Sequence, residues 1–209
     1  MDDRTETVNP PPGGEDPATG DGGAQAPSWE VSGEIAEQLE QFLICALVWS
    51  PAEQAVAAGQ WLTAEDFWTP SMGRLFELVC DLARQGRPHH APMVMNELER
   101  GGDLTGAAAR NLIRNLTDAT LVGAPPEALP GYIDAVLSAA YRRSYRQAAV
   151  RLAQIAEQAP ESRLFELLVD IGTGQRTAWR RLQDFRTRGV AELAGTAAPP
   201  AGGADEATG

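Results

Sequence analysis

Apolar residues recur at helical spacing through most of the chain, and proline and glycine residues divide this pattern into segments. The most regular part runs from Asp66 to Leu104, where two amphipathic stretches are joined by a short loop. Pro70 suits the first position of a helix, and Gly86 suits a left-handed helix end. Pro92 begins the second stretch, and a glycine pair ending at Gly102 stops it. We therefore predict a pair of helices whose apolar faces must be covered by the rest of the chain.

The same helical spacing continues on both sides of this pair. The expected helices fall at residues 32–49, 51–58, 105–116, 130–158, 161–171 and 176–188. Thr63 and Asp66 have the spacing of a capping box, which predicts a single turn between them. Large apolar residues flank this turn, and we expect core packing for them in preference to ligand stacking: Trp61, Leu62, Phe67 and Trp68. No segment alternates with period two, so the predicted fold is all-α.

Residues 130–158 form the longest predicted helix, about 40 Å at 1.5 Å per residue. A helix of this length extends beyond a compact head, so its far half must pack on a second copy of itself or on the following helix. We expect the short helix at 161–171 to end at Gly172 and Gly174. An arginine-rich amphipathic helix at 176–188 then completes the fold.

Composition changes sharply along the chain and defines four parts. Residues 1–31 form an acidic Pro/Gly tail, and residues 191–209 form an Ala/Gly/Pro tail. Both are expected to be disordered, because they offer too little apolar surface to offset chain entropy. Between them we expect a compact helical head at 32–128. A region of long helix, short linker-like helix and arginine-rich helix at 129–190 follows.

The formal net charge of −12 is distributed unevenly. Residues 31–140 carry fourteen acids and six arginines, whereas residues 141–190 carry five acids and ten arginines. The acidic body argues against general coating of nucleic acid, while the basic segment keeps a local contact with phosphate or an acidic partner open. No lysine occurs among the 17 basic residues, which excludes Schiff-base chemistry and a P-loop phosphate lysine.

Few side chains in the sequence are of the types that usually catalyse reactions or bind metals. Cys45 and Cys80 lie within apolar helical runs and are expected to be buried thiols. His89 and His90 have no acids or thiols at ligand spacing, so we expect an exposed loop pair and no metal site. We predict no catalytic residue, no metal and no cofactor.

Neither a signal peptide nor a membrane-spanning run is visible, so the expected location is the cytoplasm.

The order of these motifs resembles the N-terminal domain of the bacterial replicative DNA helicase (DnaB) family, over about residues 32–158. The matching residues are Glu40-Gln41-Phe42-Leu43 through Leu47, Ser50-Pro51, Asp66-Phe67 and Pro70, Leu75-Phe76 to Leu82, Gly86-Arg87-Pro88, Leu98 with Gly101 and Leu104, Leu112 to Leu116, and Tyr132-Ile133 to Arg142-Arg143. His90 departs from the family, which usually has an Asp there. Pro92 also replaces an aliphatic residue, and the stretch after Gly172 matches no family pattern.

The resemblance implies a helical head and a long helical hairpin that pairs with a second copy. In this family such domains form the collar of a hexameric ring and help to recruit primase and loader proteins. The P-loop ATPase domain of the family is not visible, so the resemblance implies helicase association and no enzyme activity. The expected partners are a second copy of the chain, as a homodimer or higher ring, and replicative helicase or primase.

Two alternatives remain open beside this interaction module of DNA replication. One is a nucleic-acid-associated regulator that uses the arginine-rich helix, although its aromatic residues have the spacing of a protein-docking face. The other is the collar half of a split helicase whose motor is a separate protein. The candidate interaction residues come from the two long C-terminal segments: Tyr141, Arg142, Arg143, Tyr145, Leu152, Trp179, Arg180, Arg181, Leu182 and Phe185.

Overall fold

The computed structural model describes residues 28–102 and 106–196, with side chains for 33–102 and 108–195. All regular elements in these ranges are helical, which confirms the all-α prediction. The α-helices are α1 (Ser28–Val48), α2 (Ala52–Trp61), α3 (Pro70–Arg84), α4 (Ala91–Arg100), α5 (Gly106–Leu121), α6 (Leu129–Gln158), α7 (Leu164–Asp184) and α8 (Val190–Thr196). Short 3₁₀ turns join them at η1 (Ala64–Asp66), η2 (Pro126–Ala128) and η3 (Glu161–Arg163), and η4 (Phe185–Gly189) is a π-helical segment.

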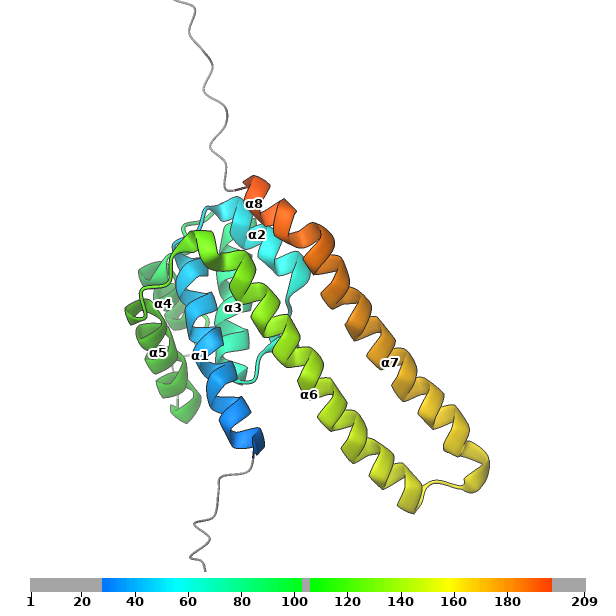
Figure 1. Cartoon of the computed structure of the whole chain (residues 1–209). Coiled ribbons are helices and arrows are strands. Elements are labelled where there is room, and N and C mark those ends of the chain that lie inside the picture. Colours follow the sequence, from blue (N-terminus) through cyan, green and yellow to red (C-terminus); the bar gives the residue numbers. More distant parts are fainter. Residues whose placement is uncertain (1–27, 103–105, 197–209) are drawn as a thin grey trace, which may run out of the picture.

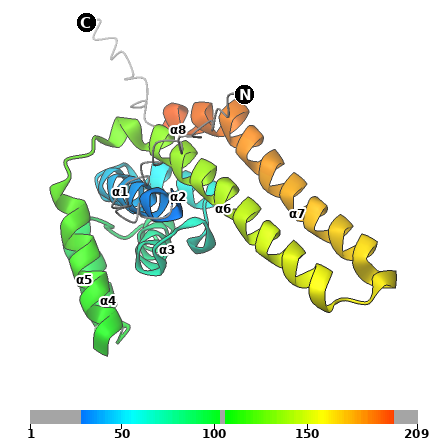
Figure 2. The same cartoon turned by 60° about the horizontal axis from the view of Figure 1, so that its bottom comes forward.

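Helix α1 is the central element of the head (Figure 1). Residues 43–48 are buried at every position, because α3, α5 and α6 pack around this half of the helix. A helix that is apolar on all sides is stable only where neighbours cover all sides. The view in Figure 2 shows α1 enclosed in this way. The rest of the head is arranged to bury this segment.

The predicted helix pair is present as α3 and α4, and Leu104 at its predicted end lies outside the described residues. Gly86 has φ +66° and Gly102 has φ +78°, so both adopt the left-handed conformation expected at helix ends. Val94 and Leu98 are fully buried against the core. The prediction that both histidines are exposed is wrong for His89. This side chain is buried, and its Nε2 lies 3.0 Å from the carbonyl oxygen of Ser50. His90 is exposed and precedes α4 without a side-chain cap, as its departure from Asp implies.

Helices α6 and α7 form an antiparallel hairpin that projects from the head (Figure 1). Helix α6 matches the predicted long helix, and its far half packs on the helix that follows it. The predicted break at Gly172 and Gly174 is wrong, since α7 continues through both glycines. Each glycine costs a helix roughly 1 kcal/mol relative to alanine. Packing of α7 along α6 provides the compensating contacts.

Four other helix boundaries also differ from the predictions, and one of them is the end of α5, which continues past the predicted residue 116 to Leu121. Helix α1 begins at Ser28, within the predicted N-terminal tail, and α8 extends to Thr196, within the predicted C-terminal tail. Helix α2 continues past Gly59 to Trp61. The remaining tail predictions, residues 1–27 and 197–209, lie outside the described residues. Among the described residues, no helix combines the length and the apolarity that crossing a bilayer requires.

Candidate interaction surface

The turn η1 is the point at which the head contacts both arms of the hairpin. The predicted capping box is present: the Thr63 backbone N–H and hydroxyl donate to Asp66 Oδ2 over 2.8 Å and 3.1 Å. These bonds hold the Asp66 carboxylate at a fixed position beside α7. Asp66 is buried, so its oxygen atoms favour a second, charged donor.

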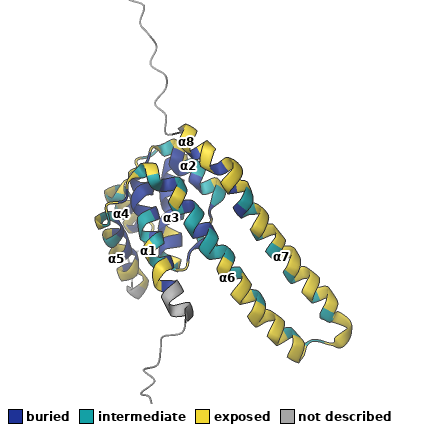
Figure 3. Ribbon diagram, viewed as in Figure 1, coloured by how far each residue is buried: buried dark blue, intermediate teal, exposed yellow. Residues whose placement is uncertain are grey.

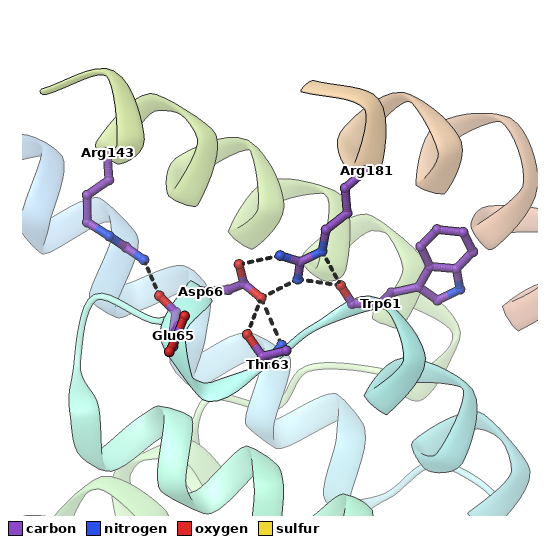
Figure 4. Close-up of polar contacts among 6 residues, drawn as sticks. All are labelled: Trp61, Thr63, Glu65, Asp66, Arg143 and Arg181. Carbon is purple, nitrogen blue, oxygen red and sulfur yellow. Dashed lines mark hydrogen bonds and ion pairs between the residues drawn. The ribbon is translucent and has the colours of Figure 1, made fainter. Parts of the chain in front are cut away.

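Arg181 of α7 supplies that donor (Figure 4). Its Nη1 donates to Asp66 Oδ1 over 2.9 Å, and its Nη2 also bonds Asp66 Oδ2. The same guanidinium group donates from Nε and Nη2 to the Trp61 carbonyl oxygen, over 3.0 Å and 2.6 Å. Bidentate pairs of this kind fix orientation as well as adding energy. Arg181, a candidate interaction residue, therefore anchors the hairpin to the head.

Further polar contacts align the two arms. The Ser144 hydroxyl lies 2.9 Å from Gln175 Oε1, and Gln175 Nε2 donates to the Ser144 carbonyl oxygen over 3.0 Å. Nearer the head, Arg186 Nε donates to Asp134 Oδ1 over 2.6 Å, and its Nη2 donates to Asp134 Oδ2 over 3.1 Å. These contacts fix the register of α7 on α6.

The end of α7 is buried in the head. Leu182 and Phe185 are both buried, and the Phe185 ring meets Trp61 edge to face at 5.4 Å. Gly189 lies so close to these rings that a Cβ atom there would be 2.8 Å from Trp61 Cε2. Leu182 and Phe185 were candidate interaction residues, but they are core residues, because the chain after Gly172 returns to the head.

Other candidates are exposed on one side of the hairpin, where Figure 3 shows the arms as largely exposed. Tyr145 is 52% exposed and Trp179 is 48% exposed, and both line one shallow groove between α6 and α7. The hydroxyl groups of Tyr141 and Tyr145 are 3.0 Å apart, and this hydrogen bond raises the pKa of Tyr141. Arg180 lines the same groove, and Leu152 is exposed further along α6.

One exposed apolar stripe, on α7, is not among the interaction residues predicted from the sequence. Phe165 is 75% exposed, and Leu168 and Val169 are also exposed, at helical spacing from Trp179. Phe165, Val169 and Trp179 share a face only if α7 is one helix. The expected break at Gly172 concealed this relationship, although the spacing itself was available.

The last two candidates line a different hollow from the one that Tyr145 and Trp179 line. Arg142 is exposed, and Arg143 Nη2 donates to the Glu65 carbonyl oxygen over 2.7 Å (Figure 4). These two arginines and the Tyr145–Trp179 groove therefore form separate surfaces. Within the described residues, no cluster of three His, Cys, Asp or Glu side chains has the arrangement of a metal site.

Comparison with known proteins agrees with this architecture. The family model of the DnaB-like helicase N-terminal domain matches residues 34–137, which cover most of α1, all of α2 to α5 and the first part of α6. No curated protein sequence matches the chain. The matched domain is the non-catalytic collar region of these helicases. Residues 34–137 are therefore a DnaB-like helicase N-terminal domain.

Proposed function

We propose that this chain is a non-catalytic interaction module of DNA replication that pairs with a second copy of itself through the hairpin. One observation carries the proposal: Tyr145 and Trp179 expose aromatic surface from both arms into one groove. Phe165, Leu168 and Val169 extend this apolar surface toward the tip. Contiguous exposed apolar surface of this kind is typical of a protein-binding face.

The surface has the composition expected of an interface. Aromatic residues and arginine are enriched at interface centres, and Arg176 and Arg180 line the groove beside Trp179. Family membership supports oligomerisation and association with helicases in general. Replicative helicase and primase are therefore the further partners that we propose, and this role places the chain in the cytoplasm.

Sedimentation of the full chain tests the pairing. We expect a mass above that of one chain, and we expect Phe165→Ser/Trp179→Ser to shift it toward the monomer. Leu121→Ser is the matched control, because Leu121 is an exposed apolar residue on α5, away from the hairpin. A strict monomer that binds neither the replicative helicase nor the primase of the same organism would overturn the proposal.

Binding of single-stranded nucleic acid is a second candidate, and the arginines beside Trp179 favour it. Stacking on an aromatic ring next to guanidinium groups is a common way to hold single strands. We expect such binding to weaken steeply with salt and to be lost in Arg176→Ala/Arg180→Ala. Arg181 is unsuitable for this test because it anchors the fold. Salt-independent or absent binding would exclude this function.

A further inference from the structure

A second surface lies between the N-terminal half of α1 and the middle of α6 (Figure 1). Two hollows there share Trp68, Arg143 and Arg146, so they form one continuous groove, which we call the Trp68 groove. It runs from Ile35 on α1, past Trp68, to Val150 on α6. At about 100° per residue, Val150 lies about 140° around α6 from Tyr145. The Trp68 groove is therefore distinct from the pairing surface.

The groove combines apolar and cationic surface. Trp68 is 36% exposed, and Ile35 and Val150 are more exposed still. The predicted core position of Trp68 is thus only partly correct. Its ring packs over Gly33, where a Cβ atom would lie 3.0 Å from Trp68 Cζ2. The absence of a side chain at Gly33 therefore leaves room for the indole of Trp68 against α1, at the edge of the groove that Trp68 lines.

The charge of the groove is strongly positive. Four arginines line it: Arg142, Arg143, Arg146 and Arg151. The acid in its lining is Asp134, whose carboxylate is paired with Arg186. A ligand for this surface must therefore be acidic and must also offer apolar groups to Trp68.

The chain itself contains such a ligand. Residues 1–27 carry six acids and one arginine, and three consecutive prolines begin at Pro10. Acids lie on both sides of these prolines, at Asp2, Asp3 and Glu6 and at Glu15 and Asp16. Proline-rich segments favour the extended polyproline II conformation and dock on aromatic surfaces at low entropic cost. We propose that residues 2–16 of each chain bind the Trp68 groove of the same chain.

The attachment point of this segment favours the intramolecular contact. The N-terminal segment joins α1 at Ser28. Ile35, at one end of the groove, lies seven residues further along α1, which is about 10 Å from Ser28 at the helical rise. A segment of 27 residues spans up to about 90 Å when extended. Tethering also gives the segment an effective concentration in the millimolar range. At that effective concentration, weak ion pairs and one proline–indole contact are sufficient to keep the segment bound in the Trp68 groove.

Paramagnetic broadening tests the contact in the full chain. A nitroxide is attached at Thr7→Cys, since Cys45 and Cys80 are buried, and the indole N–H signal of Trp68 is identified by its loss in Trp68→Phe. We expect the Trp68 signal to lose most of its intensity while that of the exposed Trp49 is retained. Raising salt from about 0.1 M to about 1 M shortens the Debye length from roughly 10 Å to about 3 Å, and should restore the signal.

Two sets of variants separate this contact from a general charge effect. Arg142→Glu/Arg151→Glu should restore the Trp68 signal, whereas the matched pair Arg110→Glu/Arg114→Glu on α5 should leave it broadened. Replacing the acids of residues 2–16 by Asn and Gln should also restore the signal without altering the groove.

Three results would overturn the proposal. The first is an unbroadened Trp68 signal in the labelled full chain at about 0.1 M salt, where charges about 10 Å apart still interact. The second is equal broadening of the Trp68 signal in isotope-labelled chain that carries no nitroxide, after nitroxide-labelled chain without isotope label is added, which would place the segment in the groove of a second copy. The third is a Trp68 signal that shifts with oligo(dT) while the nitroxide leaves it unbroadened, which would make the groove a nucleic-acid site.

Discussion

Arg181 and Asp66 lie 115 residues apart in the chain, yet the guanidinium group of Arg181 bonds both carboxylate oxygens of Asp66. The capping box at Thr63 holds Asp66, and the Trp61 carbonyl oxygen accepts two more bonds from Arg181. The contact joins the turn η1 to the returning arm of the hairpin. It therefore determines how the hairpin is held against the head.

Replacing this arginine should destabilise the fold. Arg181→Ala leaves the buried Asp66 carboxylate without its cation, and we expect a loss of about 2 kcal/mol in the free energy of unfolding. Urea denaturation followed by circular dichroism measures this change. Arg180→Ala is the control, because this exposed neighbour should change stability by less than about 0.5 kcal/mol. Equal losses in the two variants would contradict the anchoring role of Arg181.

Two glycines of the C-terminal region should respond in opposite directions to alanine. Gly189→Ala places a Cβ atom 2.8 Å from Trp61 Cε2, and we expect a loss of about 1–3 kcal/mol. Gly174→Ala meets no atom within 4 Å in the middle of α7, and should stabilise the helix by up to about 1 kcal/mol. Thermal unfolding of both variants checks this pair. A destabilised Gly174→Ala would mean that α7 is not a continuous helix.

Glu40 should make stability depend on pH. Its carboxylate accepts the Trp68 backbone N–H and, over 3.1 Å, that of Thr69, but burial raises its pKa above the ordinary value of 4.5. The folded state therefore holds this proton more tightly than the unfolded state. The free energy of unfolding should fall as pH rises from 4.5 through the raised pKa, and the penalty should be complete above it.

Glu40→Gln removes this titration and provides the comparison. At low pH the Glu40 carboxyl group is protonated and, like the amide, has one carbonyl oxygen to accept an N–H, so the two chains should be similarly stable there. As pH rises, the unmodified chain should lose stability relative to Glu40→Gln, because only the unmodified chain pays the desolvation penalty. Urea midpoints between about pH 4 and pH 7 measure this trend. A difference that does not change with pH would show that Glu40 titrates normally.

Cys80 should be unreactive in the folded chain. Burial raises the pKa of its thiol to about 12, which leaves roughly one part in 10⁵ as thiolate at pH 7. In Cys45→Ala, we expect the disulfide reagent DTNB to react with Cys80 only after urea unfolds the protein. Rapid reaction of the native variant would mean that α3 opens readily at this position.

Much of the head could be predicted because its determinants are local. Pro70 and Gly86 mark the two ends of α3 in the sequence, and the Thr63–Asp66 spacing correctly predicted the turn η1. Helical periodicity alone predicted the all-α class and the extent of α6. Such features depend on backbone preferences and on neighbours within a few residues.

The predictions failed where contacts between distant segments outweigh these local preferences. Gly172 and Gly174 resemble a helix end, but packing on α6 keeps α7 continuous. His89 resembles an exposed loop residue, but the Ser50 carbonyl oxygen gives it a buried partner. Neither partner is recognisable from the local sequence.

The sequence by itself determined the helical class, the order of the helices and the separation of an acidic head from a basic hairpin. Only the tertiary structure decided the roles of the candidate residues, because each role depends on which segment lies opposite. Leu182 and Phe185 belong to the core, and Arg181 is an anchor. Trp179 has the same helical spacing as Leu182, yet it is exposed, because the head covers only one side of α7.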